Sequence, residues 1–289
     1  VLDERVASEV AELFETLAAG ENAQATLGQS GGEDVLFDIM KHHPNKVDIL
    51  KRLAKTTSVL HGSDEASVAM FVDRIEQLLP SLSSDADESQ IVSELSDTIA
   101  MVSNITLIDG ILDQATTDRL VNSLASATAV LREKPQSSLV ANCLASCLSA
   151  LGKLLAVDAV KVDADVVAEA VTASLAVTSQ NDASSPVVQS AATCIGNLAS
   201  TSDGIAVIAS RGMLAAVKNA GVRKAKVGVV SAQAAGQAIT NAIEAITQQA
   251  MSHATTLVGQ PGGARLIAEI LMGMADMKAV RTTLGQIAS

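Results

Sequence analysis

The stretch that decides the fold is GQSGGEDVLFDIMKHHPNKVDILKRLAKTTS, residues 28–58, because it occurs again in altered form as GQPGGARLIAEILMGMADMKAVRTTLGQIAS, residues 259–289. The two stretches align without a gap at an offset of 231 residues, and both keep the glycine pair and the apolar positions after it. A second match, ASCLSAL at 145–151 against ATCIGNL at 192–198, has an offset of 47. One unit of roughly 46 residues, used about six times, explains both offsets.

Helical periodicity dominates the rest of the chain. Apolar residues recur at three- and four-residue spacing, as in amphipathic helices, over 1–18, 47–60, 91–105, 140–155, 187–198 and 229–246. Helix breakers separate these segments, among them the glycine pairs at 31–32 and 262–263, Gly212, Pro44, Pro80 and Pro135. The chain is therefore predicted to be all-α. Since one unit cannot bury its apolar face alone, the units are expected to stack into an α-solenoid.

Composition agrees with closely packed helices and argues against nucleic acid. Of the 289 residues 48% are apolar but only 1% are aromatic, so Ala, Val, Leu and Ile must build the core. The net charge is −12, and residues 1–100 hold all of the excess acid, which repels phosphate. A basic run lies within the acid-free stretch 204–243 and predicts a charged surface for an acidic partner: Arg211, Lys218, Arg223, Lys224 and Lys226.

The cysteines and the hydropathy pattern predict a protein of a reducing compartment, and the cytoplasm is the expected location. Cys143 and Cys147 share one helical face, and Cys194 aligns with Cys147 across the repeat, which indicates a core position. No window approaches 18 consecutive apolar residues, so no membrane span is expected. The chain begins with a leftover helix and ends in mid-pattern, so we expect a fragment of a longer array or ends that stack on another copy.

Three segments resemble armadillo repeats. These are 28–40 and 208–217, which are similar to the family's glycine-containing corner, and 187–200, which is similar to its long third helix. The resemblance implies a right-handed superhelix of about six three-helix repeats in one domain, residues 1–289. The approximate units are 20–60, 62–106, 108–153, 155–200, 202–247 and 249–289, with 1–18 as the last helix of a preceding unit. Units 108–153 and 155–200 lack the glycine pair, so HEAT-like geometry stays open there.

The resemblance also implies a partner-binding groove along the third helices. Asn104, Asn197 and Asn241 fall at the family's asparagine place and are the candidate groove contacts, since an amide both donates to and accepts from an extended backbone. Import adaptors of the family carry Trp four residues earlier, where this chain has Ala100, Thr193 and Gln237. The expected function is therefore a non-enzymatic protein-binding scaffold of a cytoskeletal, ciliary or other large assembly. The alternatives are a cargo adaptor or myosin-type chaperone module, or a talin- or vinculin-like helical linker.

The sequence offers few residues that could support catalysis or bind a metal or cofactor. GQSGG has the letters of a nucleophile elbow, but no strand precedes Ser30, and its repeat partner is Pro261. His42 and His43 are adjacent, and neighbouring side chains on a helix point apart. No phosphate-binding loop, dinucleotide fingerprint or zinc-protease motif occurs. We expect no catalytic residues, no metal and no cofactor.

Overall fold

A computed structural model describes residues 3–18, 32–43, 46–61, 66–82, 88–106, 112–134, 137–157, 161–177, 185–224 and 230–272. Throughout these residues the regular structure is helical, with no strand among them, so the all-α prediction is confirmed. The helices are α1 (Glu4–Ala18), α3 (Gly32–His42), α4 (Val47–His61), α5 (Ala66–Leu82), α6 (Glu88–Ile105), α7 (Gln114–Glu133), α8 (Ser138–Leu154), α9 (Ala164–Val177), α10 (Ser185–Ala199), α11 (Ser202–Arg211), α12 (Met213–Lys224), α13 (Val230–Ser252) and α14 (Ala254–Leu257). A further helix covers 263–272.

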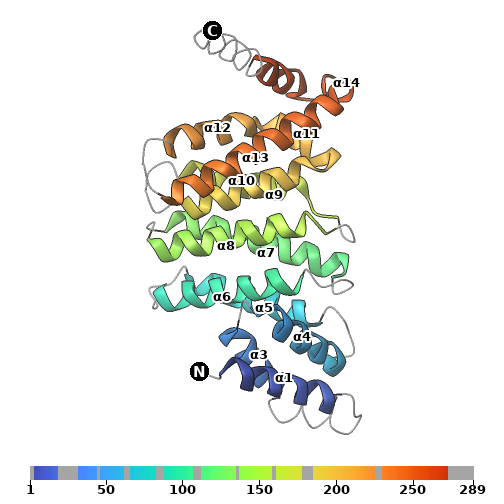
Figure 1. Ribbon diagram of the computed structural model, residues 1–289, viewed down its shortest axis with the longest axis vertical. Coiled ribbons are helices and arrows are strands. Elements are labelled where there is room, and N and C mark those ends of the chain that lie inside the picture. Colours follow the sequence, from blue (N-terminus) through green and yellow to red (C-terminus); the bar gives the residue numbers. More distant parts are fainter. Residues whose placement is uncertain are drawn as a thin grey trace, which may run out of the picture.

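The helices pack in two layers that run the length of the molecule. The first layer holds α1, α4, α6, α8, α10 and α13 in that order, each packed against the next (Figure 1). The second layer holds α5, α7 and α9, followed by α11 and α12, which both pack against α9. Across the layers α5 packs on α6, α7 on α8, α9 on α10 and α12 on α13. Every central helix therefore has neighbours on two sides of its own layer and at least one neighbour in the other layer.

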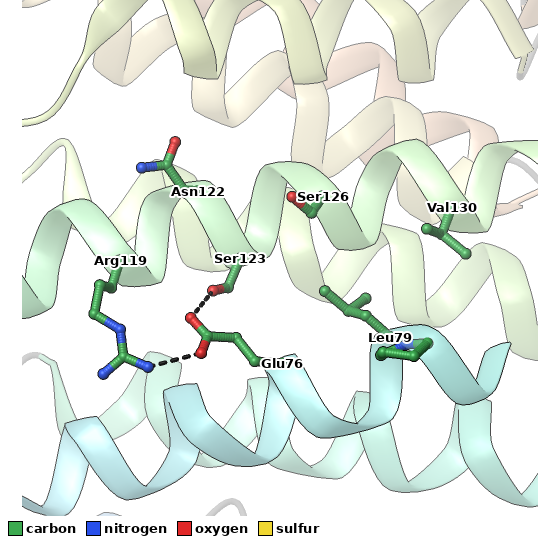
Figure 2. Close-up of a pocket in the computed structure, with 8 residues that line it drawn as sticks. Glu76, Leu79, Arg119, Asn122, Ser123, Ser126 and Val130 are labelled. Atoms are coloured by element: carbon green, nitrogen blue, oxygen red, sulfur yellow. Dashed lines mark hydrogen bonds and ion pairs between the residues drawn. The ribbon is translucent and has the colours of Figure 1, made fainter. Parts of the chain in front are cut away.

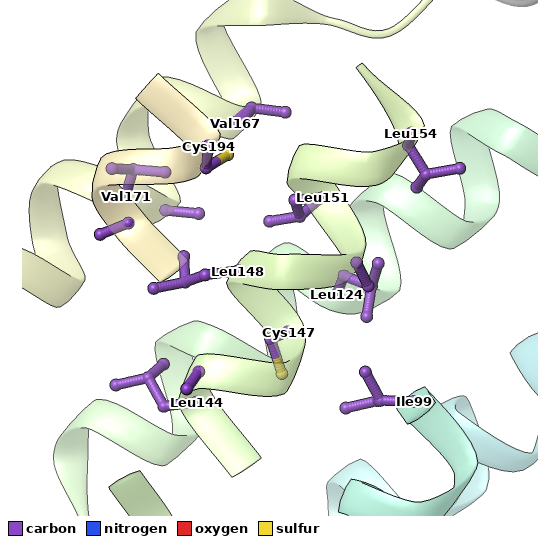
Figure 3. Packing of buried hydrophobic residues seen from close by; sticks show 14 of the residues in the cluster. Ile99, Leu124, Leu144, Cys147, Leu148, Leu151, Leu154, Val167, Val171 and Cys194 are labelled. Carbon is purple, nitrogen blue, oxygen red and sulfur yellow. The ribbon is translucent and has the colours of Figure 1, made fainter. Parts of the chain in front are cut away.

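The core between the layers is built from small and branched aliphatic side chains, as the composition predicts. On α8 the fully buried residues include Leu144, Leu148 and Leu151, and they meet residues from α6, α7, α9 and α10 (Figure 3). Cys143, Cys147 and Cys194 are all free thiols buried in this core. Their prediction as core residues is confirmed.

Glycines with positive φ make the predicted corners. Gly212 has φ +64° and ends α11, and Gly262 has φ +75° just before the helix at 263–272. A side chain is excluded at Gly262, because a Cβ there would lie 2.2 Å from the carbonyl oxygen of Ala209. The corner role predicted for glycine at these two places is confirmed, whereas Gly31 lies outside the described residues.

The predicted three-helix unit describes only part of the chain. The described residues of units 62–106, 108–153 and 155–200 form two helices each, while 202–252 holds three. The physical reason is the corner glycine. Gly212 divides α11 from α12, and together these two helices form one end of the second layer. In the middle of that layer α7 alone spans the corresponding place, since it continues for 20 residues without a break.

Helix bounds follow most of the predicted periodic segments closely, with differences at a proline and at predicted segment 229–246, which became α13 and ends six residues later. Predicted segments 91–105, 140–155 and 187–198 became α6, α8 and α10 with ends shifted by three residues or fewer. Pro80, predicted as a breaker, lies inside α5, which ends two residues later at Leu82. The helix therefore stops just after the proline.

Candidate functional site

The first layer exposes one continuous polar surface. Its helices bury the sides that touch the second layer and their neighbours, so solvent meets only the fourth side. Exposed and half-buried residues recur there at three- and four-residue steps, and we call this surface the polar face. Its members on α6, α8, α10 and α13 are Ser93, Asp97, Ala100, Asn104, Asn142, Ser146, Ser149, Lys153, Gln189, Thr193, Asn197, Gln237, Asn241 and Glu244.

The predicted groove asparagines lie on this face, on three different helices. Asn104 is near the end of α6, Asn197 is near the end of α10, and Asn241 is in the middle of α13. The residues one turn earlier, at the family's tryptophan place, are short or flexible rather than aromatic. The polar face therefore offers amides and hydroxyls and lacks stacking surfaces among its members.

Asn197 joins α10 to α8. Its Nδ2 donates a 2.7 Å hydrogen bond to the carbonyl oxygen of Gly152, which belongs to the last turn of α8. The two helices come close at this point, since a Cβ on Gly152 would lie 3.3 Å from the Cα of Cys194. A carbonyl in a helix's last turn has no partner within the helix, so the Asn197 amide supplies one.

Lys153 joins α8 to α6 in a similar way. Its Nζ donates to Oδ1 of Asn104 at 3.1 Å and lies 3.5 Å from the carbonyl oxygen of Ser103. Burial lowers the pKa of Lys153, because an ammonium loses hydration there. Sequence reasoning missed this lysine. The signal was available, since Lys153 stands in the last turn of α8 beside Gly152, one period after Asn104 and one before Asn197.

Asn241 has a different environment from the other two asparagines. Its Oδ1 accepts a 2.9 Å hydrogen bond from Nε2 of Gln237, one turn earlier on the same helix, and both side chains are exposed. Asn104 and Asn197 therefore take part in contacts between helices, whereas the bond between Asn241 and Gln237 stays within α13.

The second layer exposes a charged surface instead. Arg119 of α7 donates 2.7 Å hydrogen bonds to Asp73 and Glu76 of α5. The hydrogen bond to Asp73 raises the pKa of Arg119, and the hydrogen bond to Glu76 raises it further. Arg211 of α11 reaches Asp165 of α9 at 3.1 Å. Pairs this exposed contribute about 0–1 kcal/mol each, so they align neighbouring helices more than they stabilise them.

The predicted basic surface is only partly described. Arg211 is paired with Asp165 and lies 3.8 Å from Glu169, so its charge is compensated. Lys218 is half-buried on α12. Lys226 and the side chains of Arg223 and Lys224 lie outside the described residues. The basic partner surface stays a prediction.

A hollow of about 520 Å³ lies between α5 and α7 in the second layer (Figure 2). At one end Glu76 accepts hydrogen bonds from Arg119 and from the hydroxyl of Ser123 at 3.1 Å, and at the other end the lining is apolar. Among the described residues that line it, the titratable groups are Glu76 and Arg119, which pair with each other. This arrangement does not supply the opposed acid and base that catalysis needs.

A second hollow, of about 690 Å³, lies where α7, α9 and α11 begin. Four aspartates and one lysine are among its described lining residues, and Nζ of that lysine, Lys161, lies 3.7 Å from a carboxylate oxygen of Asp203. In the described part of the chain, no group of three or more His, Cys, Asp and Glu side chains is arranged to hold a metal ion. Ser30 lies outside that part. Nδ1 of His42 lies 2.7 Å from the carbonyl oxygen of Asp38 in its own helix.

Comparisons with protein-family models, with curated protein sequences and with solved structures found no match. Among the described helices, none has the length and hydropathy required to cross a bilayer.

Proposed function

We propose that this protein is a non-enzymatic, armadillo-like α-solenoid scaffold that binds an extended segment of a partner protein across the polar face. The observation that carries the proposal is the composition of that face. Side chains able both to donate and to accept hydrogen bonds are exposed on three neighbouring helices, α8, α10 and α13, with few charges and no aromatic side chain among them.

Support for a repeating unit comes from the polar contacts between successive helices. Asn104–Lys153, Gly152–Asn197, Asp73–Arg119 and Asp165–Arg211 join residues 45 to 49 positions apart. These separations match the period of about 46 residues in the sequence. Contacts that repeat with the period of the chain are what a stack of similar modules requires, since each module touches only its neighbours.

The spacing of the first-layer helices suits an extended chain that crosses them. Packed helices lie about 8–10 Å apart, and an extended chain advances about 3.3 Å per residue, so one helix corresponds to about three residues. From Asn104 on α6 to Asn241 on α13 there are three such intervals, or about nine residues of the partner. Asn197 keeps Oδ1 and one N–H for the partner, because its bond to Gly152 uses only the other N–H.

The scaffold also loses little conformational entropy on binding. The helices that carry the face are held by a continuous core on their inner side, and the end of α8 is tied to α6 and α10 by Lys153 and Asn197. Because the surface is preformed, the scaffold does not have to become more ordered when it binds. Most of the loss of conformational entropy therefore falls on the partner's segment. A cytoskeletal or ciliary setting stays a prediction from the resemblance alone.

The test is selection of 12-residue random peptides displayed on phage against the full chain, followed by binding measurements on the selected peptides. Gln189→Trp places an indole on the polar face, away from the position where the family carries its tryptophan, and Ser126→Trp places the same group on the exposed side of α7. We expect Gln189→Trp to weaken binding at least tenfold and Ser126→Trp to leave it unchanged. Equal effects of the two variants, or no selected peptide at all, would refute the proposal.

A further inference from the structure

We infer that Lys153 marks a subsite for a carboxylate side chain, so that the segment bound on the polar face carries an Asp or Glu at the position that crosses α8. This inference rests on the proposed function and adds the chemistry of the partner.

The first observation is that Lys153 has no anionic partner among the residues that the structure describes. Arginines that join neighbouring helices elsewhere in the described chain all reach carboxylates: Arg74 pairs with Glu94, Arg119 with Asp73 and Glu76, and Arg211 with Asp165. No described carboxylate lies within ion-pair distance of Lys153, whose hydrogen bonds go to an amide oxygen and a carbonyl oxygen. An ammonium has three donors, so at least one remains for a ligand.

The second observation is the burial of this ammonium. Lys153 is half-buried, and the loss of hydration lowers the pKa of the group. A partly desolvated cation gains more from an anion than a fully exposed one does, because the interaction is less screened. The oxygen acceptors at the end of α6 offset part of that loss of hydration, and a carboxylate would offset more.

The third observation is the position of Lys153 on the face. It stands on α8 between Asn104 of α6, to which it is hydrogen-bonded, and Asn197 of α10, which is bonded to the residue before it. A segment that crosses the three helices therefore passes Lys153 between two asparagines. At about three residues per helix, the acidic residue should lie about three positions from each residue that contacts an asparagine.

Charge on the rest of the face agrees with an acidic residue only near α8. Glu244 of α13 is exposed on the polar face, and half-buried Asp97 of α6 lies on it two turns before Asn104. Each would repel a second carboxylate of the segment. The partner's segment is therefore expected to carry its negative charge at α8 and neutral or basic residues on either side.

The experiment repeats the peptide selection on four full-length proteins: the unchanged chain, Lys153→Gln, Lys153→Glu and Lys161→Gln. Lys161→Gln is the matched control, because it removes an exposed lysine that belongs to the hollow at the starts of α7, α9 and α11. We expect one strongly enriched Asp/Glu position with the unchanged chain and with Lys161→Gln. That enrichment should disappear with Lys153→Gln and turn into enrichment of Lys or Arg with Lys153→Glu.

A binding measurement then separates a ligand contact from a structural role of the lysine. A selected peptide in which the acidic residue is replaced by its amide should bind the unchanged chain about tenfold more weakly, and should bind Lys153→Gln no differently from the parent peptide. Lys153→Arg keeps the charge and should keep the acidic preference. Thermal melting of each variant above the assay temperature establishes that it is folded.

Two outcomes would overturn the inference. Enriched peptides without an acidic position would show that Lys153 only caps the end of α6, while peptide binding to the polar face would stand. The same acidic position enriched on Lys153→Gln would place the carboxylate elsewhere. Failure to select any peptide with any of the four proteins would refute the proposed function itself.

Discussion

The contact between Asn197 and Gly152 makes the stability of the molecule depend on a residue of the polar face. Asn197→Ala removes the donor and leaves the carbonyl oxygen of Gly152 without a partner. The N–H groups after Gly152 do not replace it, because those of Leu155 and Ala156 donate to Leu151 and Lys153. We therefore expect Asn197→Ala to destabilise the fold, although alanine is the better helix former.

The magnitude follows from the geometry. A net hydrogen bond contributes about 0.5–1.5 kcal/mol, and an unpaired polar group out of water costs about 1–3 kcal/mol. The bond is short at 2.7 Å, and the site is half-buried, so a loss of about 1–2 kcal/mol is expected. For a chain of this size that lowers the melting temperature by about 2–6 °C.

Asn241→Ala is the matched control. The substitution and the gain in helix propensity are the same, but the side-chain bond of Asn241 goes to exposed Gln237 on its own helix and contributes only a few tenths of a kcal/mol. Thermal and urea unfolding of the two variants should therefore differ by about 1–2 kcal/mol. If Asn197→Ala is as stable as Asn241→Ala, the contact does not hold α8 to α10.

Asn197→Asp sharpens the same test. A carboxylate facing the Gly152 carbonyl oxygen is repelled by it, so at neutral pH this variant should be less stable than Asn197→Ala. Protonation restores a donor, so the stability of Asn197→Asp relative to Asn197→Ala should rise as the pH falls below about 4. A relative stability that stays constant from pH 7 to pH 3 would contradict the assigned bond.

Further predictions concern the backbone, the ion pairs and the buried thiols. Gly204→Ala should lower the free energy of unfolding by about 2 kcal/mol or more, because its Cβ would lie 1.9 Å from the carbonyl oxygen of Leu198. Gly236→Ala has open space around it and should raise the free energy of unfolding by about 0.5–1 kcal/mol, and urea unfolding measures both. Arg211→Asp alone should cost about 1 kcal/mol of unfolding free energy or less, and the double variant that also carries Asp165→Arg should recover most of that loss. In 1 M NaCl the two variants should melt at the same temperature. Burial raises the pKa of Cys194 to about 12, so a maleimide at pH 8 should label this thiol only after unfolding, and labelling of the native protein at the rate of a free thiol would contradict its burial. Since the unfolded thiol ionises near pH 9, the stability that Cys194 contributes is present below that pH and is lost between pH 9 and 12.

Sequence reasoning predicted the helices well, because each of them carries its own periodic pattern. α6, α8 and α10 follow the spacing of their apolar residues, and the repeated cysteine position proved to be buried core. The number of helices per unit was harder to predict, since it depends on one backbone conformation. Gly212 adopts positive φ and divides two helices, whereas the long helix α7 contains no glycine. The spacing of apolar residues does not reveal whether a helix is divided in this way.

The candidate site was harder to predict than the helices, since a side chain's role depends on what the neighbouring module places against it. The same sequence pattern selected Asn104, Asn197 and Asn241, but their contacts differ. Asn104 accepts a hydrogen bond from a lysine of α8, Asn197 donates one to a carbonyl oxygen of α8, and Asn241 is bonded within α13. Lys153 escaped notice because a lysine in a last helical turn is ordinary on its own. It becomes informative only once the structure shows that the end of α6 lies beside it and that no carboxylate of the described residues is within ion-pair distance.

The two exposed surfaces differ in a way that bears on where a partner binds. In the second layer, acids and bases of neighbouring helices satisfy each other, as Arg119 and Arg211 do, so a ligand there must first compete with pairs already formed. On the polar face the helices are joined by bonds that leave donors and acceptors unused, at Asn197 and at Lys153. Binding to the polar face adds hydrogen bonds without breaking ion pairs. For the same number of contacts, therefore, an extended segment gains more free energy on α6, α8, α10 and α13 than on the charged side.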